Sequence, residues 1–141
     1  MVLFEERDGW LMNTPKPFIV DQAMLDWECW RDASAASESA IWWKLLVTGE
    51  RSQSQGIVTG IAVLAPGAEL PPHHHEPEET YYVVSGQGER EIDDERTAVG
   101  PGCAIYIPAC ARHALRCTGS EPLSFVFSFA RDRFDQITYH F

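Results

Sequence analysis

From residue 41 onward, the sequence is a succession of short apolar runs separated by turn-forming residues. Residues 122–130, PLSFVFSFA, alternate aromatic and small side chains, and a period of two is typical of a strand with one buried face. The runs at 41–49 and 56–67 flank a polar segment and predict a hairpin. Turn-forming residues recur at 85–88, 93–95, 100–102 and 118–120. Many short strands at close intervals predict an all-β sandwich or barrel.

The first 40 residues have a different pattern. Prolines at positions 15 and 17 exclude a regular helix there, so we expect an arm laid on the barrel or a strand that contacts a partner. Residues 20–32 are predicted to form a short helix that Asp21 caps. Its apolar stripe, which we expect to pack on the barrel, is Met24, Trp27 and Trp30. The predicted division is therefore 1–40 for the arm and helix, and 41–141 for the barrel domain.

Composition and charge exclude several classes of function. A chain of 141 residues fits one domain, and four cysteines without a CxxC pair indicate packed, reduced thiols. The net charge of -10 would repel nucleic acid and anionic membrane surfaces. The N-terminus is acidic where a signal peptide is basic, and no apolar run is long enough to span a bilayer. We therefore expect a cytoplasmic protein that contacts neither nucleic acid nor membrane and acts on a small molecule.

The stretch 67–86, GAELPPHHHEPEETYYVVSG, carries the candidate metal ligands. His73 and His75 are two positions apart, which on a strand places both imidazoles on one face, with Cα atoms roughly 7 Å apart. His74 then points to the other face and is the poorest candidate of the three. Glu79 lies too far along a straight strand, so we expect a bend at Pro77 to bring it back. A further histidine, at position 113, lies far along the chain.

These residues fit a longer pattern that resembles the cupin superfamily. The first cupin motif, G-x5-HxH-x3,4-E-x6-G, is matched in full between Gly67 and Gly86. His73 and His75 are its histidine pair, and Glu79 follows three residues later. The second motif, G-x5-PxG-x2-H-x3-N, is met at Gly102, Pro108 and His113. Two positions depart from it, with Cys110 in place of the glycine and Cys117 in place of the asparagine.

The resemblance spans roughly residues 40–130 and implies a fold and a site. The fold would be a conical cupin β-barrel, a double-stranded β-helix or jelly roll, in a chain that is commonly a homodimer. The resemblance also implies that one divalent metal ion is held by His73, His75, Glu79 and His113. Mixed imidazole and carboxylate ligands suit Fe(II), our first expectation, and also Mn, Ni, Co or Zn. Four protein ligands leave positions open for substrate, which favours an enzyme over a closed structural site.

Three functions fit such a centre. The first expectation is a dioxygenase that acts on a small organic substrate, carboxylates included. The second is a lyase or isomerase in which Tyr81 serves as the base. The Glu-x-Tyr sequence after the HxH pair is similar to the cupin-type dimethylsulfoniopropionate lyases, although tyrosines there also serve as barrel packing. The third is a non-catalytic metal-binding or sugar-binding cupin.

Two sets of residues around the centre follow from the same interpretation. Basic side chains that could anchor a substrate carboxylate, or form surface ion pairs, are Lys44, Arg90 and Arg112. The parity of the strands predicts an apolar inner wall made of Ile61, Val63, Val83, Ile105 and Phe127.

Overall fold

The computed structural model describes residues 15–31 and 40–141. Residues 1–14, the greater part of the predicted arm, lie outside the described residues. Within these two ranges, three short helical turns accompany ten strands: η1 Gln22–Met24, α2 Gly49–Ser52 and η2 Phe134–Gln136. The strands are β1 Glu28–Arg31, β2 Ala40–Val47, β3 Val58–Leu64, β4 Glu69–His73, β5 Glu79–Ser85, β6 Gly88–Ile92, β7 Glu95–Val99, β8 Ala104–Ile107, β9 His113–Cys117 and β10 Leu123–Phe129.

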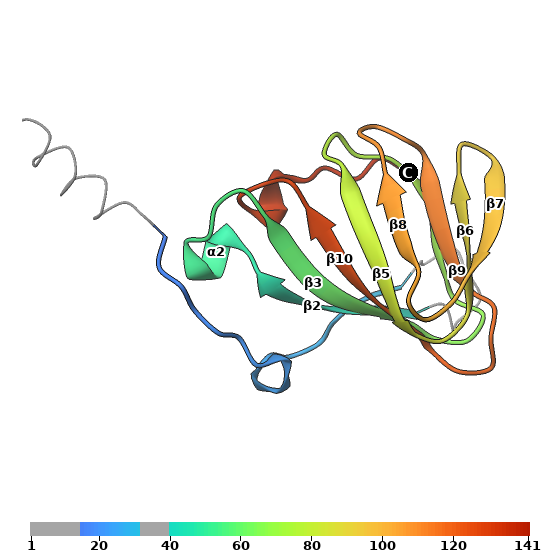
Figure 1. Cartoon of the computed structure of the whole chain (residues 1–141), viewed down its shortest axis with the longest axis horizontal. Coiled ribbons are helices and arrows are strands. Elements are labelled where there is room, and N and C mark those ends of the chain that lie inside the picture. The colour runs from blue at the N-terminus through green and yellow to red at the C-terminus, as the bar shows by residue number, and fades with distance from the viewer. Residues whose placement is uncertain (1–14, 32–39) are drawn as a thin grey trace, which may run out of the picture.

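The strands form two antiparallel sheets (Figure 1). One has six strands in the order β1-β2-β3-β10-β5-β8, and the other has four in the order β4-β9-β6-β7. The predicted hairpin is confirmed, because β2 pairs with β3. The all-β, jelly-roll type of architecture predicted from the sequence is confirmed as well. No helix within the described ranges is long and apolar enough to cross a membrane.

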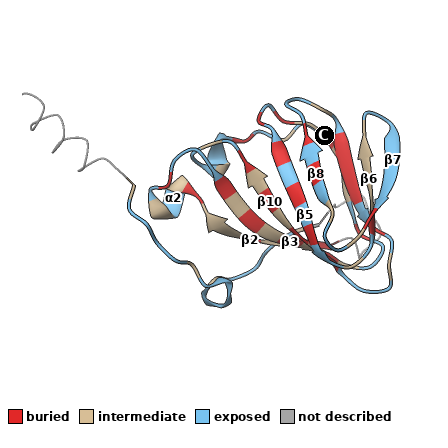
Figure 2. Cartoon of the chain, in the orientation of Figure 1, coloured by how far each residue is buried: buried red, intermediate tan, exposed pale blue. Residues whose placement is uncertain are grey.

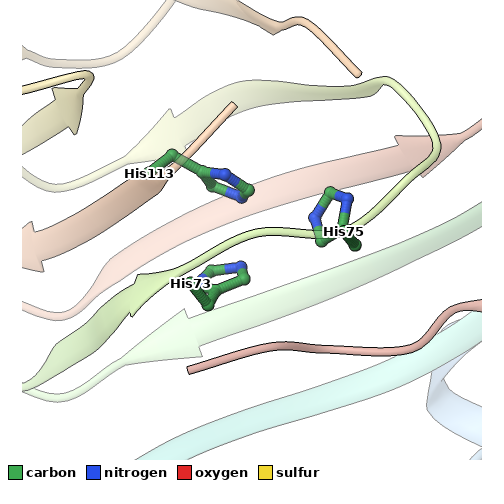
Figure 3. Close-up of side chains that lie close together, drawn as sticks. All are labelled: His73, His75 and His113. Atoms are coloured by element: carbon green, nitrogen blue, oxygen red, sulfur yellow. The ribbon is translucent and has the colours of Figure 1, made fainter. Parts of the chain in front are cut away.

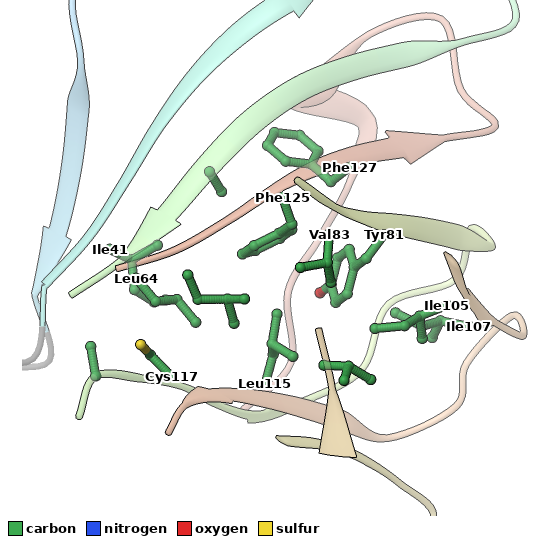
Figure 4. Close-up of a cluster of buried hydrophobic side chains, with 14 of the residues drawn as sticks. Ile41, Leu64, Tyr81, Val83, Ile105, Ile107, Leu115, Cys117, Phe125 and Phe127 are labelled. Atoms are coloured by element: carbon green, nitrogen blue, oxygen red, sulfur yellow. The ribbon is translucent and has the colours of Figure 1, made fainter. Parts of the chain in front are cut away.

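The core lies between the sheets and follows from alternation along the strands. Every second residue of β10 is buried, and β5 likewise alternates buried and exposed residues at its start (Figure 2). Large side chains such as Phe125, Leu64 and Leu115 are almost fully enclosed (Figure 4). Burying a side chain of this size stabilises the fold by about 1.5–3 kcal/mol. Packing of these faces therefore fixes which side chains point into the barrel.

The predicted helix over residues 20–32 is wrong. Asp21 accepts a hydrogen bond from the Ala23 N–H, but the helical turn that it caps ends at Met24. Residues 28–31 instead pair with β2, with Trp30 opposite Ile41. This pairing satisfies the backbone of the segment within the six-stranded sheet and overrides the three-residue spacing of the apolar side chains.

The apolar stripe of that predicted helix is consequently dispersed. Met24 is 83% exposed and does not pack on the barrel. Trp27 is 44% exposed, and the Lys44 ammonium lies 4.6 Å from its ring centroid. Of the three residues, only Trp30 packs against the core. Lys44 is itself buried and donates a hydrogen bond to the Gln22 carbonyl at 2.7 Å, so it is neither a substrate anchor nor part of a surface ion pair.

The predicted inner wall is right in three positions and wrong in two. Val83, Ile105 and Phe127 are buried in the core. Ile61 and Val63 lie on the opposite face of β3, whose buried positions include Gly60 and Ala62. Since β3 is apolar on both faces, its alternation alone does not say which face is inside. The small inward residues leave room for the ring of Phe127, which would lie 2.2 Å from a Cβ at Gly60.

Candidate metal centre

Four predicted ligands come together from three strands and one connecting segment. His73 ends β4 and His113 begins β9, and the two are directly paired across the four-stranded sheet. His75 lies just beyond β4, and Glu79 begins β5 in the other sheet. The chain bends at residues 76 and 77, as the sequence predicted, and so carries Glu79 back toward the histidines.

The three imidazole rings converge on one point (Figure 3). One nitrogen from each of His73, His75 and His113 lies within 4.8 Å of the others, so the three side chains could hold a metal ion. The Glu79 carboxylate adds to this cluster, with its oxygens 3.7 Å from the Nε2 atoms of His75 and His113. All four side chains are at most 3% exposed.

Backbone carbonyls determine which ring nitrogen faces the centre. Nδ1 of His73 lies 2.8 Å from the Pro71 oxygen, and Nδ1 of His113 lies 2.8 Å from the Ala111 oxygen. His75 makes the same contact, at 3.0 Å, with the Pro77 oxygen. A carbonyl only accepts hydrogen bonds, so each Nδ1 is the protonated nitrogen and each Nε2 presents a lone pair. This arrangement orients histidines that bind metals in proteins.

The donor atoms fit a divalent metal ion. Nε2 of each histidine and Oε1 of Glu79 are buried and have no hydrogen-bond partner within the described part of the chain. Buried polar atoms without partners are costly, and four of them aimed at one another indicate an absent group. Burial and the neighbouring His113 lower the pKa of His73 to about 3 and that of His75 to about 4. Both rings are therefore neutral near pH 7, as ligands must be.

Glu79 and Tyr81, at the edge of this cluster, influence each other's pKa. Burial raises the pKa of the Glu79 carboxyl, an effect that the neighbouring His113 and Tyr81 side chains oppose. Burial and the adjacent Glu79 carboxylate raise the pKa of the Tyr81 hydroxyl well above its usual range. A divalent cation at the centre would act in the opposite direction on both groups, because it stabilises their anionic forms.

A cavity of about 280 Å³ adjoins the cluster through Glu79 and Tyr81. Its walls are mainly aromatic, with side chains from β1, β2, β10 and the segment after β10. The lining residues are Trp30, Ile41, Trp43, Ala62, Leu70, Glu79, Tyr81, Phe125, Phe127, Phe134, Tyr139 and Phe141. The volume is close to the lower end of the range for small-molecule sites, ~300 to 1,000 Å³. Lys44, Arg90 and Arg112 are absent from this lining.

Sequence reasoning missed several residues of the cavity wall, among them Tyr139 and Phe141. The Tyr139 ring centroid lies 5.3 Å from that of His73 and 5.4 Å from that of His75. A period of two over 137–141, ITYHF, was the signal that could have found them. His140 lies between the two and stacks on His74 with ring centroids 4.9 Å apart, so His74 faces away from the three converging rings.

The departures from the second motif leave the turn before His113 intact. Cys110 has a φ of 63°, a left-handed conformation that favours glycine, which is the residue that the motif has there. Its N–H donates to the His75 carbonyl at 2.9 Å and so links this turn to the ligand segment. Cys117 is buried, and its thiol donates to the Glu121 carbonyl at 3.2 Å.

Two antiparallel sheets that enclose converging histidines define a small barrel protein able to hold one metal ion. Comparison with known proteins identifies the family. Residues 60–129 match the model of the cupin domain. The chain belongs to the cupin superfamily, as its two motifs predicted. The polyketide cyclase RemF from Streptomyces resistomycificus has the same fold, with a TM-score of 0.71 and 23% identity over 89% of this chain and 87% of that one.

Two curated relatives are enzymes with different names. The dimethylsulfoniopropionate lyase DddW of Ruegeria pomeroyi is 37% identical over 99 residues, 70% of this chain and 64% of the relative. The 5-nitrosalicylic acid 1,2-dioxygenase of a Bradyrhizobium species is 33% identical over 66 residues, 47% of this chain and 32% of the relative. The chain thus spans less than two thirds of the length of either relative.

Proposed function

We propose that this protein is a metal-dependent lyase that removes a proton beside the carboxylate of a small acid and expels a leaving group from the next carbon. The observation that carries the proposal is the position of Tyr81. Its side chain is 3% exposed and lines the cavity together with Glu79, and its ring centroid lies 6.3 Å from that of His113. The similarity to a dimethylsulfoniopropionate lyase over 99 residues supports the same reaction class.

The proposed ligands are His73, His75, Glu79 and His113, and the proposed ion is one divalent transition metal, with Fe(II) first and Mn, Ni, Co or Zn as alternatives. When bound, the ion would supply Lewis-acid stabilisation of the substrate carboxylate and of the Tyr81 phenolate. No lysine or arginine lines the cavity within the described residues. The positive charge that attracts a substrate carboxylate would therefore come from the metal ion and not from a basic side chain.

In the proposed step, the Tyr81 phenolate oxygen takes a proton from the carbon next to the carboxylate. The electron pair of that C–H bond forms a C=C bond, and the bond from the adjacent carbon to the leaving atom breaks. With dimethylsulfoniopropionate as substrate, sulfur leaves with the electron pair as dimethyl sulfide, acrylate remains and Tyr81 holds the proton. The apolar walls exclude water, so the tyrosine oxygen is the base close to the substrate.

Replacement of Tyr81 by phenylalanine tests the proposal, because it removes the base and keeps the ring that packs 4.8 Å from Phe125. We expect the metal-loaded wild type to convert dimethylsulfoniopropionate without oxygen, with dimethyl sulfide measured by gas chromatography. Tyr81→Phe should retain its metal and lose at least ~100-fold in kcat, as expected when a general base is removed. Tyr82→Phe, at the neighbouring exposed position, is the control. Full activity in Tyr81→Phe would contradict the assignment.

Dioxygenase chemistry is the second candidate, and the similarity to the 5-nitrosalicylic acid 1,2-dioxygenase favours it. The cavity's aromatic walls would suit an aromatic substrate as well. Oxygen uptake by the Fe(II)-loaded protein distinguishes the two reactions. Oxygen consumption that depends on a hydroxylated aromatic acid, with no turnover of dimethylsulfoniopropionate, would favour the dioxygenase.

A further inference from the structure

The segment 137–141 lies alongside the chain that carries two of the candidate ligands. His74 and His140 form an isolated antiparallel bridge. The His74 N–H donates to the His140 carbonyl at 2.9 Å, and the His140 N–H donates to the His74 carbonyl at 3.0 Å. His74, which lies between the candidate ligands His73 and His75, is thus held to this segment by two backbone hydrogen bonds.

Alternation along the segment gives its two faces different roles. His140 points away from the three converging rings and stacks on His74. Tyr139 and Phe141 occupy the other face, and their ring centroids lie 5.3 Å and 5.6 Å from that of His73. Both rings line the cavity. The bridge therefore places two aromatic side chains on the cavity wall beside His73.

Phe141 lies at the mouth of the cavity and meets a side chain from the opposite end of the described chain. It is 65% exposed, and its ring lies parallel to that of Trp30, at 8° and a centroid distance of 5.9 Å. Tyr139 is less exposed and lies 6.2 Å from Phe141. Together these three rings, which we call the mouth wall, bound one side of the entrance.

The chain is also fixed just before this segment, at η2. The Glu50 carboxylate accepts hydrogen bonds from the N–H groups of Asp135 at 2.6 Å and Phe134 at 3.3 Å. Thr48 accepts a further bond from Phe134 at 3.1 Å. Because η2 and the His74–His140 bridge hold the segment at both ends, the mouth wall has a defined position and can limit the size of what enters.

The charge of the cavity indicates which group faces this wall. Within the described chain, Glu79 is the one charged residue that lines the cavity, and eight of the twelve lining residues are aromatic. Aromatic faces attract cations and do not bind carboxylates well. A substrate held at the metal by its carboxylate would thus direct a compact cationic group, such as a methylated sulfonium, against the aromatic walls.

We infer that Tyr139 and Phe141 are specificity-determining residues, which restrict the end of the substrate opposite its carboxylate to a small methylated onium. This inference rests on the proposed lyase function for the identity of the substrate. Because the selectivity depends on the shape of the rings and not on the tyrosine hydroxyl, Tyr139→Phe should keep the selectivity of the wild type. Phe141→Ala removes a ring at the mouth and should admit a larger group.

The test compares dimethylsulfoniopropionate with its S,S-diethyl analogue. In Phe141→Ala, the ratio of kcat/KM for the diethyl analogue to that for the dimethyl substrate should rise about tenfold or more, the scale on which a pocket senses a methylene group. Metal content should stay that of the wild type. Thr138→Ala, at an exposed position of the same segment, is the matched control and should leave the ratio unchanged. An unchanged ratio in Phe141→Ala would overturn the inference, since a general loss of stability lowers both values together.

A second measurement does not depend on activity. Binding of tetramethylammonium and tetraethylammonium to the metal-free protein can be followed by tryptophan fluorescence, because Trp30 and Trp43 line the cavity. The wild type should prefer the tetramethyl ion, and Phe141→Ala should lose that preference. Wild-type protein that binds neither ion, or both alike, overturns the inference. Failure to cleave either sulfonium substrate, combined with the expected ammonium preference, would instead reject the lyase function alone.

Discussion

At the scale of single residues, the site depends on the tautomers of three histidines. Each Nδ1 is occupied by a backbone carbonyl two residues away, at Pro71, Pro77 or Ala111. Because each carbonyl lies only two positions before or after its histidine, local backbone conformation orients every ring before any metal binds. The energy needed to arrange the ligands is thus supplied by folding, which favours tight binding of the ion.

This arrangement predicts a pH-dependent stability of the metal-free protein. Burial and neighbouring histidines lower the pKa of His73 to about 3 and that of His75 to about 4, whereas an unfolded histidine titrates near 6.5. As the pH falls below about 6.5, the unfolded state takes up protons that the folded state does not. The free energy of unfolding should therefore decrease by up to ~1.4 kcal/mol per pH unit for each of the two histidines between pH 6 and 4.

Glu79 has the opposite effect, because burial raises its pKa and its protonation on acidification stabilises the fold. Urea unfolding between pH 7 and 5 is therefore best measured in metal-free Glu79→Gln protein. Adding His73→Leu to this background should make the pH dependence shallower, whereas adding Thr138→Ala, at an exposed position, should not change it. Stability that does not vary over this range in the Glu79→Gln background would contradict the assigned histidine states.

Much of the residue-scale site was predictable from the sequence. The spacing of His73, His75, Glu79 and His113 predicted which side chains come together, since a strand's period of two and one bend suffice for the first three. The hydrogen bonds to Pro71 and Ala111 were not predictable, because they depend on backbone dihedrals and not on residue identity. Tyr139 was missed because its position follows from a bridge to His74, distant in the sequence.

At the scale of elements, β3 shows how a small residue makes room for the core. A Cβ on Gly60 would lie 2.2 Å from Cζ of Phe127 and 2.7 Å from the Lys44 carbonyl oxygen. The second contact is with backbone and cannot be relieved by a rotamer change.

We expect Gly60→Ala to lower the free energy of unfolding by about 1–3 kcal/mol, the usual effect of overpacking. Thermal unfolding followed by circular dichroism measures the change. Ser120→Ala, in an exposed turn, should stay within about 0.5 kcal/mol of the wild type. A Gly60→Ala protein as stable as the wild type would mean that β3 and β10 are further apart than described.

Element prediction succeeded where alternation and turn chemistry agree. The alternating run of β10 and the turn at Asp93 and Asp94, both with positive φ, are examples. It failed at residues 28–31, where Trp30 lies in a strand that was predicted as helix. Four residues are too few for a periodic signal, and the pairing partner Ile41 lies across a segment outside the described residues.

At the scale of the whole molecule, the candidate centre joins the two sheets. His73 and His113 belong to the four-stranded sheet, whereas Glu79 begins a strand of the six-stranded sheet. An ion shared by these residues would tie the sheets together, so it should stabilise the fold as any ligand of the native state does.

The homodimer implied by the cupin resemblance stays a prediction. The outer face of the six-stranded sheet carries exposed apolar side chains at Tyr82, Val84 and Tyr106, which are 52%, 49% and 63% exposed. We expect light scattering to give about twice the chain mass of 15.9 kDa, and Tyr106→Arg to shift the protein toward the monomer because a charge there opposes burial. Tyr106→Phe is the control. A monomeric wild type would contradict this prediction.

The central claim, that His73, His75, Glu79 and His113 bind one metal ion, is tested most directly by elemental analysis of protein purified without added metal and then loaded with Fe(II) or Mn(II). The wild type and His74→Ala should bind one ion per chain, because His74 faces away from the centre. His75→Ala and His113→Ala should lose most of the metal and keep the circular dichroism spectrum of the fold. Stoichiometric metal in both of these variants would contradict the assignment.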